Sequence, residues 1–235
     1  MSTNHEGSGL ASSLTDLMTS LAVIFILLLV GMLNNAQQEA KGIKSQVLTR
    51  LQNALKEFEK NGVQVTPDPK DPLALLVLVP EDLLNFAQNQ AQIPPKGQKF
   101  LLNFIPKLVS TACSSDLRQG ISSIVVEGHT SSEGTDAWNI ELSQERSLAV
   151  VQASLTILDG DQKAGTASSG LHDCFLNFVS ATGRGRTDPI LTASGQEDRE
   201  RSRRVIFKIR VQSLEQRQLE RQVTLTSKAR AEGGQ

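Results

Sequence analysis

The chain has 235 residues and a formal net charge of -1, which fits one domain of ordinary size with a membrane segment and tails. A charge so close to zero gives no general attraction to nucleic acid. The two cysteines, Cys113 and Cys174, belong to no CxxC or Cys/His cluster, so we expect no zinc site.

The first predicted element is a transmembrane helix over residues 11–35, which follows a small, polar tail at residues 1–10. The run Leu17–Leu33 contains no charged residue. Counted from Ala11 to Leu33, a helix would be about 34 Å long at ~1.5 Å per residue, enough to cross a bilayer. The start lacks the Lys or Arg of a signal peptide, so we expect an uncleaved single-pass anchor.

Asp16 is the only charged residue between Gly7 and Gln38, and a charge inside a membrane is costly. Two interpretations are open from the residues alone. Asp16 caps the helix in the headgroup zone, or it faces a partner or an aqueous path and carries an ion. Its neighbours Thr15, Thr19 and Ser20 either hydrate such a path or pack between helices as ordinary small polar residues.

Residues 36–72 are predicted to be a connector, a helix followed by a proline-rich linker. Apolar residues recur in its first part at steps of three and four: Ile43, Val47, Leu51, Leu55 and Phe58. This pattern fits a plain amphipathic connector or the seam of a homodimer, and we favour some self-association. The stretch "NGVQVTPDPKDP" then breaks the helix.

A compact domain is predicted over residues 73–212, with a Gln- and Arg-rich tail at 213–235. Strands are predicted at 73–79, 121–129, 175–183 and 203–211, helices at 94–112 and 135–158, and a loop of small residues at 160–170. The second helix is expected to bury Trp138, Leu142, Leu148, Val151 and Leu155. The order of elements predicts an α+β fold, a mixed sheet with helices on one face.

The domain contains the motifs Gly128-His129-Thr130, Gly134, Trp138-Asn139 and Leu142-Ser143-x-x-Arg146, followed by "GRGRTDP" and "RSRRVIFKI". These motifs resemble those of the OmpA-like peptidoglycan-binding domain. The segment "LTDLMTSL" is similar to the start of the membrane helix in MotB-type stator subunits. Together they resemble a MotB-like B subunit. The short connector and the absence of a basic cytoplasmic tail favour the B subunits of Zorya anti-phage systems over a flagellar MotB.

The resemblance implies a peptidoglycan site made of Thr130, Ser131, Trp138, Asn139, Leu142 and Arg146. Asn139, Leu142 and Arg146 share one helical face, and the family uses this arginine to bind the diaminopimelate carboxylate of the stem peptide. The alternatives are a surface Arg146 paired with Glu145 or Asp136, and a Trp138 that packs in the core. Ser131 replaces the family's acid, so the stem's ammonium group lacks its usual partner unless Glu133 or Asp136 takes that role.

The resemblance also implies an ion-driven motor in the bacterial inner membrane, with the N-terminus in the cytoplasm and the domain in the periplasm. Two copies of the chain would sit inside a pentameric, multi-span, MotA-like A subunit, and Asp16 would carry H⁺ or, as a second possibility, Na⁺. In a Zorya system such a motor would activate cytoplasmic effectors. The alternatives are a flagellar stator and a passive membrane-to-wall tether. We expect no enzymatic activity, no cofactor and no nucleic-acid partner.

Three further features are expected to have structural roles. His129 is expected to be structural, "GRGR" to be a turn, and Arg199–Arg204 to be the solvated flank of a strand. Cys113 and Cys174 are expected at neighbouring ends of elements, one ending the first helix of the domain and one opening the third strand. Because the periplasm is oxidising, we predict a disulfide between them.

Overall fold

The computed structural model describes residues 6–84, 86–87, 89–163 and 170–213, together with residues 216, 219 and 223. The chain divides into two compact units at the Gly42/Ile43 bond. The predicted 160–170 loop and the C-terminal tail lie partly outside the described residues. Of that loop, residues 160–163 are still helical.

The N-terminal unit is made of the first part of helix α1 (Glu6–Glu59), which begins inside the predicted 1–10 tail. Its window Leu14–Asn35 is 22 residues long and has a mean hydropathy of 2.4. This window is long and apolar enough to cross a membrane, and none of it is buried against other parts of the chain. The finding fits a single-pass membrane protein.

The second part of α1 corrects the predicted connector. Val47, Leu51 and Leu55 are completely buried, and the Phe58 ring packs edge-to-face on Phe104 with 5.4 Å between centroids. These side chains belong to the core of the domain itself, so they are not the exposed seam of a homodimer. The compact unit therefore begins at Ile43 rather than near Leu73.

A five-stranded mixed sheet forms the centre of the domain, with the order β1-β2-β5-β3-β4. The strands are β1 (Gln64–Pro67), β2 (Ala74–Pro80), β3 (Ile121–His129), β4 (Val179–Gly183) and β5 (Arg204–Val211). β3 and β4 are parallel, and every other pair is antiparallel. β1 lies within the segment predicted to be a linker. It is an edge strand that pairs with β2, and its Val65 side chain is buried.

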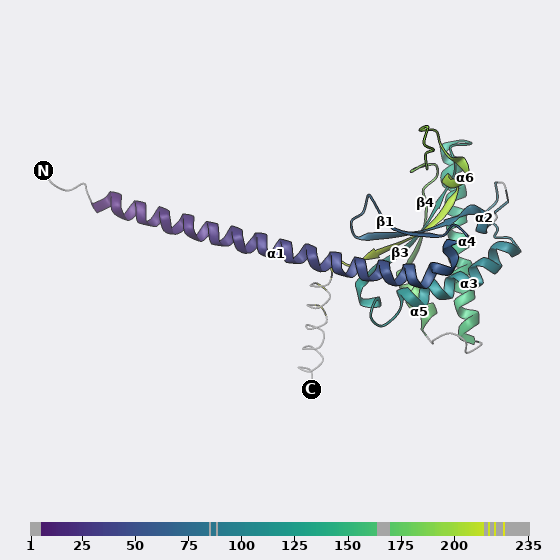
Figure 1. The fold of residues 1–235 in the computed structure, drawn as a ribbon, viewed down its shortest axis with the longest axis horizontal. Coiled ribbons are helices and arrows are strands. Elements are labelled where there is room, and N and C mark those ends of the chain that lie inside the picture. Colours follow the sequence, from purple (N-terminus) through teal and green to yellow (C-terminus); the bar gives the residue numbers. More distant parts are fainter. Residues whose placement is uncertain are drawn as a thin grey trace. The chain divides into compact units, whose positions relative to one another are not determined.

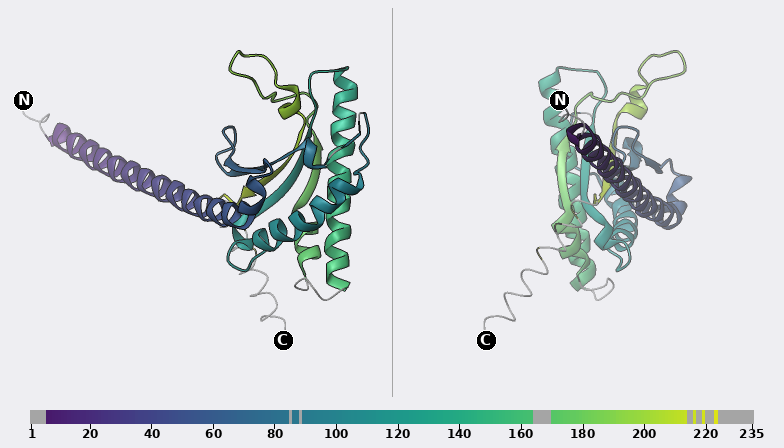
Figure 2. Two further views of the ribbon diagram at one scale, coloured as in Figure 1. Left: turned by 45° about the vertical axis from the view of Figure 1, so that its right-hand side comes forward. Right: turned by 90° about the vertical axis from the view of Figure 1, so that its left-hand side faces the viewer.

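The helices are α2 (Glu81–Leu84), α3 (Pro95–Ala112), α4 (Asp136–Lys163), α5 (Leu171–Phe178) and α6 (Arg199–Ser202), with a 3-10 turn at Arg118–Gly120. α3, α4 and α5 lie beside the sheet in Figures 1 and 2. Their apolar sides share one core with the end of α1 and with alternate residues of the strands, such as Phe104 with Phe207. The predicted α+β fold, with helices on one face of a mixed sheet, is confirmed.

Two predictions about helices are wrong. Residues 175–178 end α5 and do not begin a strand, so β4 starts only at Val179. On α4, Trp138 and Leu148 are exposed, while Ser143, Ser147 and Ser154 are completely buried. The packed side of α4 therefore includes small serines, which hydrophobic spacing did not predict.

A disulfide joins Cys113 to Cys174, with their Cα atoms 6.3 Å apart. Cys113 caps the end of α3, and Cys174 lies in α5 rather than at the start of a strand. The bridge closes a loop over a sequence separation of 61 residues. A loop of this size corresponds to roughly 4 kcal/mol of stabilisation in the chain-entropy model.

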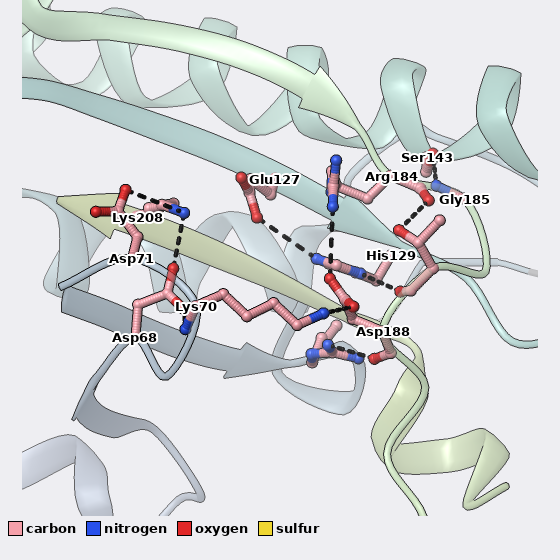
Figure 3. A network of polar contacts seen from close by, with 12 residues as sticks. Asp68, Lys70, Asp71, Glu127, His129, Ser143, Arg184, Gly185, Asp188 and Lys208 are labelled. Atoms are coloured by element: carbon pink, nitrogen blue, oxygen red, sulfur yellow. Dashed lines mark hydrogen bonds and ion pairs between the residues drawn. The ribbon is translucent and has the colours of Figure 1, made fainter. Parts of the chain in front are cut away.

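The opposite face of the sheet carries a network of ion pairs (Figure 3). Lys208 Nζ lies 2.7 Å from Asp68 and 3.6 Å from Asp71. Asp188 pairs with Lys70 and lies 3.5 Å from Arg184. Burial raises the pKa of Asp68, but hydrogen bonds from Lys208 and from the Lys70 backbone outweigh it, so this pKa lies below its usual value.

Candidate functional site

A cleft of about 1030 Å³ lies at one end of the sheet. α2 and the segment after it, the loop that follows β3, the first turns of α4 and α6 all contribute to it. Its lining includes all six residues that the sequence assigned to the peptidoglycan site: Thr130, Ser131, Trp138, Asn139, Leu142 and Arg146.

Close packing of α4 against the sheet positions these residues. A Cβ atom at Gly128 would lie 2.2 Å from the Ser143 carbonyl oxygen, so only glycine fits there. The Ser143 hydroxyl accepts a hydrogen bond of 2.9 Å from the Gly185 N–H, and the Gln144 side chain accepts one of 2.6 Å from the Gly183 N–H. The motif glycines and serine therefore fix the helix whose face carries Asn139, Leu142 and Arg146.

Arg146 is almost completely buried, with 5% of its surface exposed. Its Nε donates to the Gln90 carbonyl at 3.0 Å, and Nη2 donates to the Ala87 carbonyl at 3.3 Å. Its Nη1 lies 2.8 Å from the Glu81 carboxylate, and the Phe86 ring covers the guanidinium at 4.9 Å. The alternative of a surface Arg146 paired with Glu145 or Asp136 is wrong, because Arg146 is buried and pairs with Glu81 of α2.

Glu81 links two arginines at the cleft. One of its oxygens pairs with Arg146, and the other accepts a 2.6 Å hydrogen bond from Nε of Arg203. Burial lowers the pKa of the Arg146 guanidinium, and Glu81 partly counteracts this effect. Because an arginine keeps its proton in proteins, Arg146 and Arg203 each carry a positive charge beside Glu81.

Two buried polar atoms at the cleft lack partners among the described residues. They are Nδ2 of Asn139 and the hydroxyl of Thr130, whose residues are 3% and 5% exposed. An unpaired buried polar group is costly, and most such groups in proteins are hydrogen-bonded. Both residues line the cleft, so a ligand or water that reached these two atoms would satisfy them.

Trp138 is 39% exposed and lines the cleft, so the prediction that it packs in the core is wrong. An exposed indole on a cleft wall offers a flat apolar face with a hydrogen-bond donor at its edge. That combination suits a ligand with both apolar and polar surface.

Ser131 lines the cleft and is buried, and it contributes a neutral hydroxyl where the family has an acid. Of the two substitutes considered, Glu133 lines the cleft and pairs with Arg199 at 2.7 Å. Asp136 is not part of the lining, and its carboxylate is held by Arg186. Two further acids, Asp82 and Glu200, also line the cleft.

His129 and the arginine-rich motif before β5 make contacts within the fold. His129 is buried, and its Nδ1 lies 3.1 Å from the Thr187 carbonyl (Figure 3). Arg204 is buried too, and it donates to the carbonyls of Ser202 and Asp188, which corrects the expectation of a fully solvated strand flank. Among the described residues, no group of three potential metal ligands lies together.

Asp16 lies at the start of the apolar window of α1 and is exposed in the chain alone. Thr19 and Ser20 follow it at three and four residues, so the three share one helical face. The Thr19 hydroxyl donates to the Thr15 carbonyl, one turn earlier in the helix. These residues belong to the N-terminal unit, whereas the residues that line the cleft belong to the other unit.

Glu81, Phe86 and Arg203 are site residues that the sequence did not single out. Glu81 and Arg203 are 122 residues apart in the chain, so no local pattern connects them. The "RSRR" motif places Arg203 before a strand, but its partner becomes evident only when β2 and β5 pair.

The sheet order, the α4 packing and the cleft define an OmpA-like domain joined to a membrane-span candidate. The OmpA family model matches residues 85–203, so the chain belongs to the OmpA family. The chain is also similar to Zorya protein ZorB from the Crooks strain of Escherichia coli, with 27% identity over 212 residues. That match covers 84% of this chain and 86% of the relative.

Two further comparisons agree with this placement. Outer membrane protein A of Bordetella avium is 29% identical over 152 residues, which cover 63% of this chain and 66% of the relative. The structure of a MotB-like protein from Desulfovibrio vulgaris superposes with a TM-score of 0.50 at 21% identity, covering 75% of this chain and 96% of that one. The resemblance to a MotB-like, ZorB-type subunit with an OmpA-like domain is confirmed.

Proposed function

We propose that the protein is the B subunit of an ion-driven membrane motor that is anchored to peptidoglycan and acts in anti-phage defence. Its partner would be a pentameric, multi-span A subunit that encloses two copies of the chain. The transported ion would be H⁺, with Na⁺ as the second candidate. The likeness to ZorB over most of both chains supports this proposal.

One observation carries the wall-binding part of the proposal. The residues assigned from sequence line a single cleft, and two of them, Asn139 and Thr130, are buried with unpaired polar atoms. The amide of Asn139 would donate to a peptide carbonyl or carboxylate of the stem. The N–H groups of Arg146 and Arg203 are donors suited to a carboxylate.

Co-sedimentation of the full chain with purified peptidoglycan sacculi tests this part. Asn139→Leu removes a donor from the cleft, so we expect at least a several-fold loss of bound protein. Asn177→Leu is the matched control, because Asn177 is exposed on α5 and lies outside the cleft lining. Equal binding by both variants and the wild type would rule out this cleft as the peptidoglycan site.

The motor part of the proposal depends on Asp16, the one acid in the apolar window. A carboxylate fixed to the cell wall through the domain would take up and release an ion while the surrounding A subunit turns. This arrangement requires the N-terminus in the cytoplasm and the domain in the periplasm.

The main alternative is a passive tether, which would need the cleft and the membrane span but not Asp16. A flagellar stator is the other alternative. The restoration of swimming in a strain that lacks its own flagellar B subunit would favour the flagellar alternative.

A further inference from the structure

The loop between β3 and α4 forms part of the cleft wall. Its residues Thr130, Ser131, Glu133 and Gly134 line the cleft. Ser132, in the middle of the loop, is exposed and lies outside the lining. A contact that holds Ser132 therefore fixes the cleft residues on both sides of it without occupying the cleft.

Glu197 makes such a contact from a distant part of the sequence. The Ser132 N–H donates to both oxygens of the Glu197 carboxylate, at 3.1 and 3.2 Å, and the Ser132 hydroxyl donates to one of them at 2.5 Å. Burial raises the pKa of Glu197, but the hydrogen bonds from Ser132 outweigh this effect, so the pKa lies below its usual value. The carboxylate is therefore ionised at neutral pH, and hydrogen bonds to an ionised acceptor are stronger than neutral ones.

The segment that carries Glu197 is itself fixed. Glu197 forms a β-bridge with Leu191. The N–H of the next residue, Asp198, donates to the Ile190 carbonyl at 2.8 Å, and the Asp198 side chain caps α6 by accepting from the Arg201 N–H at 3.1 Å. Glu197 is thus held by a bridge on one side and a helix start on the other, so it can act as an anchor for the loop after β3.

A second contact joins the same two segments but is weaker. Arg199 Nη1 lies 2.7 Å from the Glu133 carboxylate, and both side chains are 59% exposed. Exposed ion pairs of this kind contribute little because water screens them. Glu197, which is half-buried and accepts from a backbone N–H, is therefore the main link between the loop and the segment before α6.

We propose that Glu197 is a positioning residue for peptidoglycan binding, because it holds the loop after β3 in the conformation that receives the ligand. This inference rests on the proposed function, since it concerns the same cleft. Glu197 lies outside the cleft lining, so its effect on the ligand is indirect. Without this anchor the loop would adopt other conformations, and the apparent affinity would fall in proportion to the fraction of molecules that remain competent to bind.

The test is titration of the full chain with purified peptidoglycan sacculi, with bound protein measured by co-sedimentation. We expect Glu197→Ala to weaken binding by about 3- to 10-fold, the effect of losing partly exposed, charge-assisted hydrogen bonds. Glu197→Gln keeps an acceptor for the Ser132 N–H and should lose less. Glu57→Ala is the matched control, because Glu57 is also an acid with a partner, Lys107 at 3.1 Å, but lies outside the cleft lining.

Two further measurements separate positioning from a general structural effect. Ser132→Ala removes only the hydroxyl, and it should weaken binding in the wild type but have little further effect in Glu197→Ala, because the two residues act through one contact. Amide hydrogen exchange of the unliganded protein should become faster in residues 130–135 of Glu197→Ala and stay unchanged in the strands. A general loss of stability would instead speed exchange throughout the sheet.

The possible failures are distinguishable. If sacculi bind wild type and Glu197→Ala equally well, the role of Glu197 is overturned while the proposed function stands. Weaker binding by Glu197→Ala with unchanged exchange in residues 130–135, or an undiminished effect of Ser132→Ala in that variant, would overturn positioning as the cause. A wild type that does not bind sacculi would contradict the proposed wall-binding function and this inference with it. If Glu197→Ala is poorly folded, Glu197→Gln should show the same pattern with a smaller loss.

Discussion

Arg146 is held by two backbone carbonyls, one carboxylate and one aromatic ring, all contributed by residues 81–90. These contacts make Arg146 a structural residue of the fold as well as a residue of the cleft. Removing one partner of a buried ion pair leaves the other charge without compensation. The consequence is a stability effect that can be measured without any ligand.

We predict that Arg146→Leu lowers the free energy of unfolding by roughly 3 kcal/mol. The carbonyls of Ala87 and Gln90 would lose their donor, and Glu81 would keep only Arg203. Urea unfolding of the full chain in detergent measures this change. Arg203→Gln, which alters a partly exposed side chain, should cost less than about 1 kcal/mol. A larger loss of stability for Arg203→Gln than for Arg146→Leu would contradict the structural role of Arg146.

The Asp68–Lys208 pair predicts a specific dependence of stability on pH. The pKa of Asp68 lies below its ordinary value of about 3.9, so its contribution is present above pH ~4 and is lost as the pH falls through the lower, folded-state pKa. Burial lowers the pKa of Lys208, but the hydrogen bond to Asp68 outweighs this effect and raises the pKa overall. The contribution of Lys208 is therefore lost only in strongly alkaline solution.

Lys208→Met should therefore cost roughly 2 kcal/mol at pH 7, and the difference from wild type should shrink as the pH falls below about 4. Urea unfolding at pH 7 and pH 3 measures both values. Lys99→Met is the control, because Lys99 is exposed on α3. A difference between Lys208→Met and wild type that does not change with pH would contradict the assignment of the stabilisation to this ion pair.

At the scale of elements, the second part of α1 decides where the domain begins. We predict that Leu55→Ala lowers the free energy of unfolding by roughly 2–5 kcal/mol, as expected for a completely buried leucine. Lys56→Ala, at an exposed position one residue along the same helix, should have almost no effect. Thermal and urea unfolding provide the comparison, and a change in oligomeric state at unchanged stability would support the dimer seam instead.

The sequence predicted elements well where their pattern admits one explanation. The alternation of Val205, Phe207, Ile209 and Val211 indicated β5, and the family motifs located the face of α4 that lines the cleft. The amphipathic pattern from Val47 to Phe58 was ambiguous, because a dimer seam and a core-facing helix need the same spacing. Residues 175–178 were misassigned because a short apolar run fits a buried helix as well as a strand.

The prediction of Trp138 failed for another reason. Hydrophobic spacing identifies apolar residues, but it does not distinguish a core position from a cleft wall that is apolar for binding. The Glu81–Arg203 contact was out of reach because it depends on the pairing of β2 with β5. The missed parts of the site are thus the ones that tertiary structure brings together.

At the scale of the whole molecule, the orientation in the membrane follows from the proposed wall binding. Alkaline phosphatase fused after Gln235 should be active, because this enzyme needs the oxidising periplasm to form its disulfides. The same reporter fused before Met1 should be inactive. The reverse pattern would place the domain in the cytoplasm, away from the cell wall.

In the proposed motor, the domain binds the wall, and Asp16, the single acid of the membrane-span candidate, carries an ion. Protection against phage, measured by plaque counts in cells that carry the complete defence system, tests this proposal. Asp16→Asn is the informative variant, and Asn34→Ala, at the other end of the apolar window, is the control. We predict that Asp16→Asn reaches the membrane and binds sacculi like the wild type but gives no protection, while Asn34→Ala protects fully. Full protection by Asp16→Asn would contradict the motor and leave a passive tether.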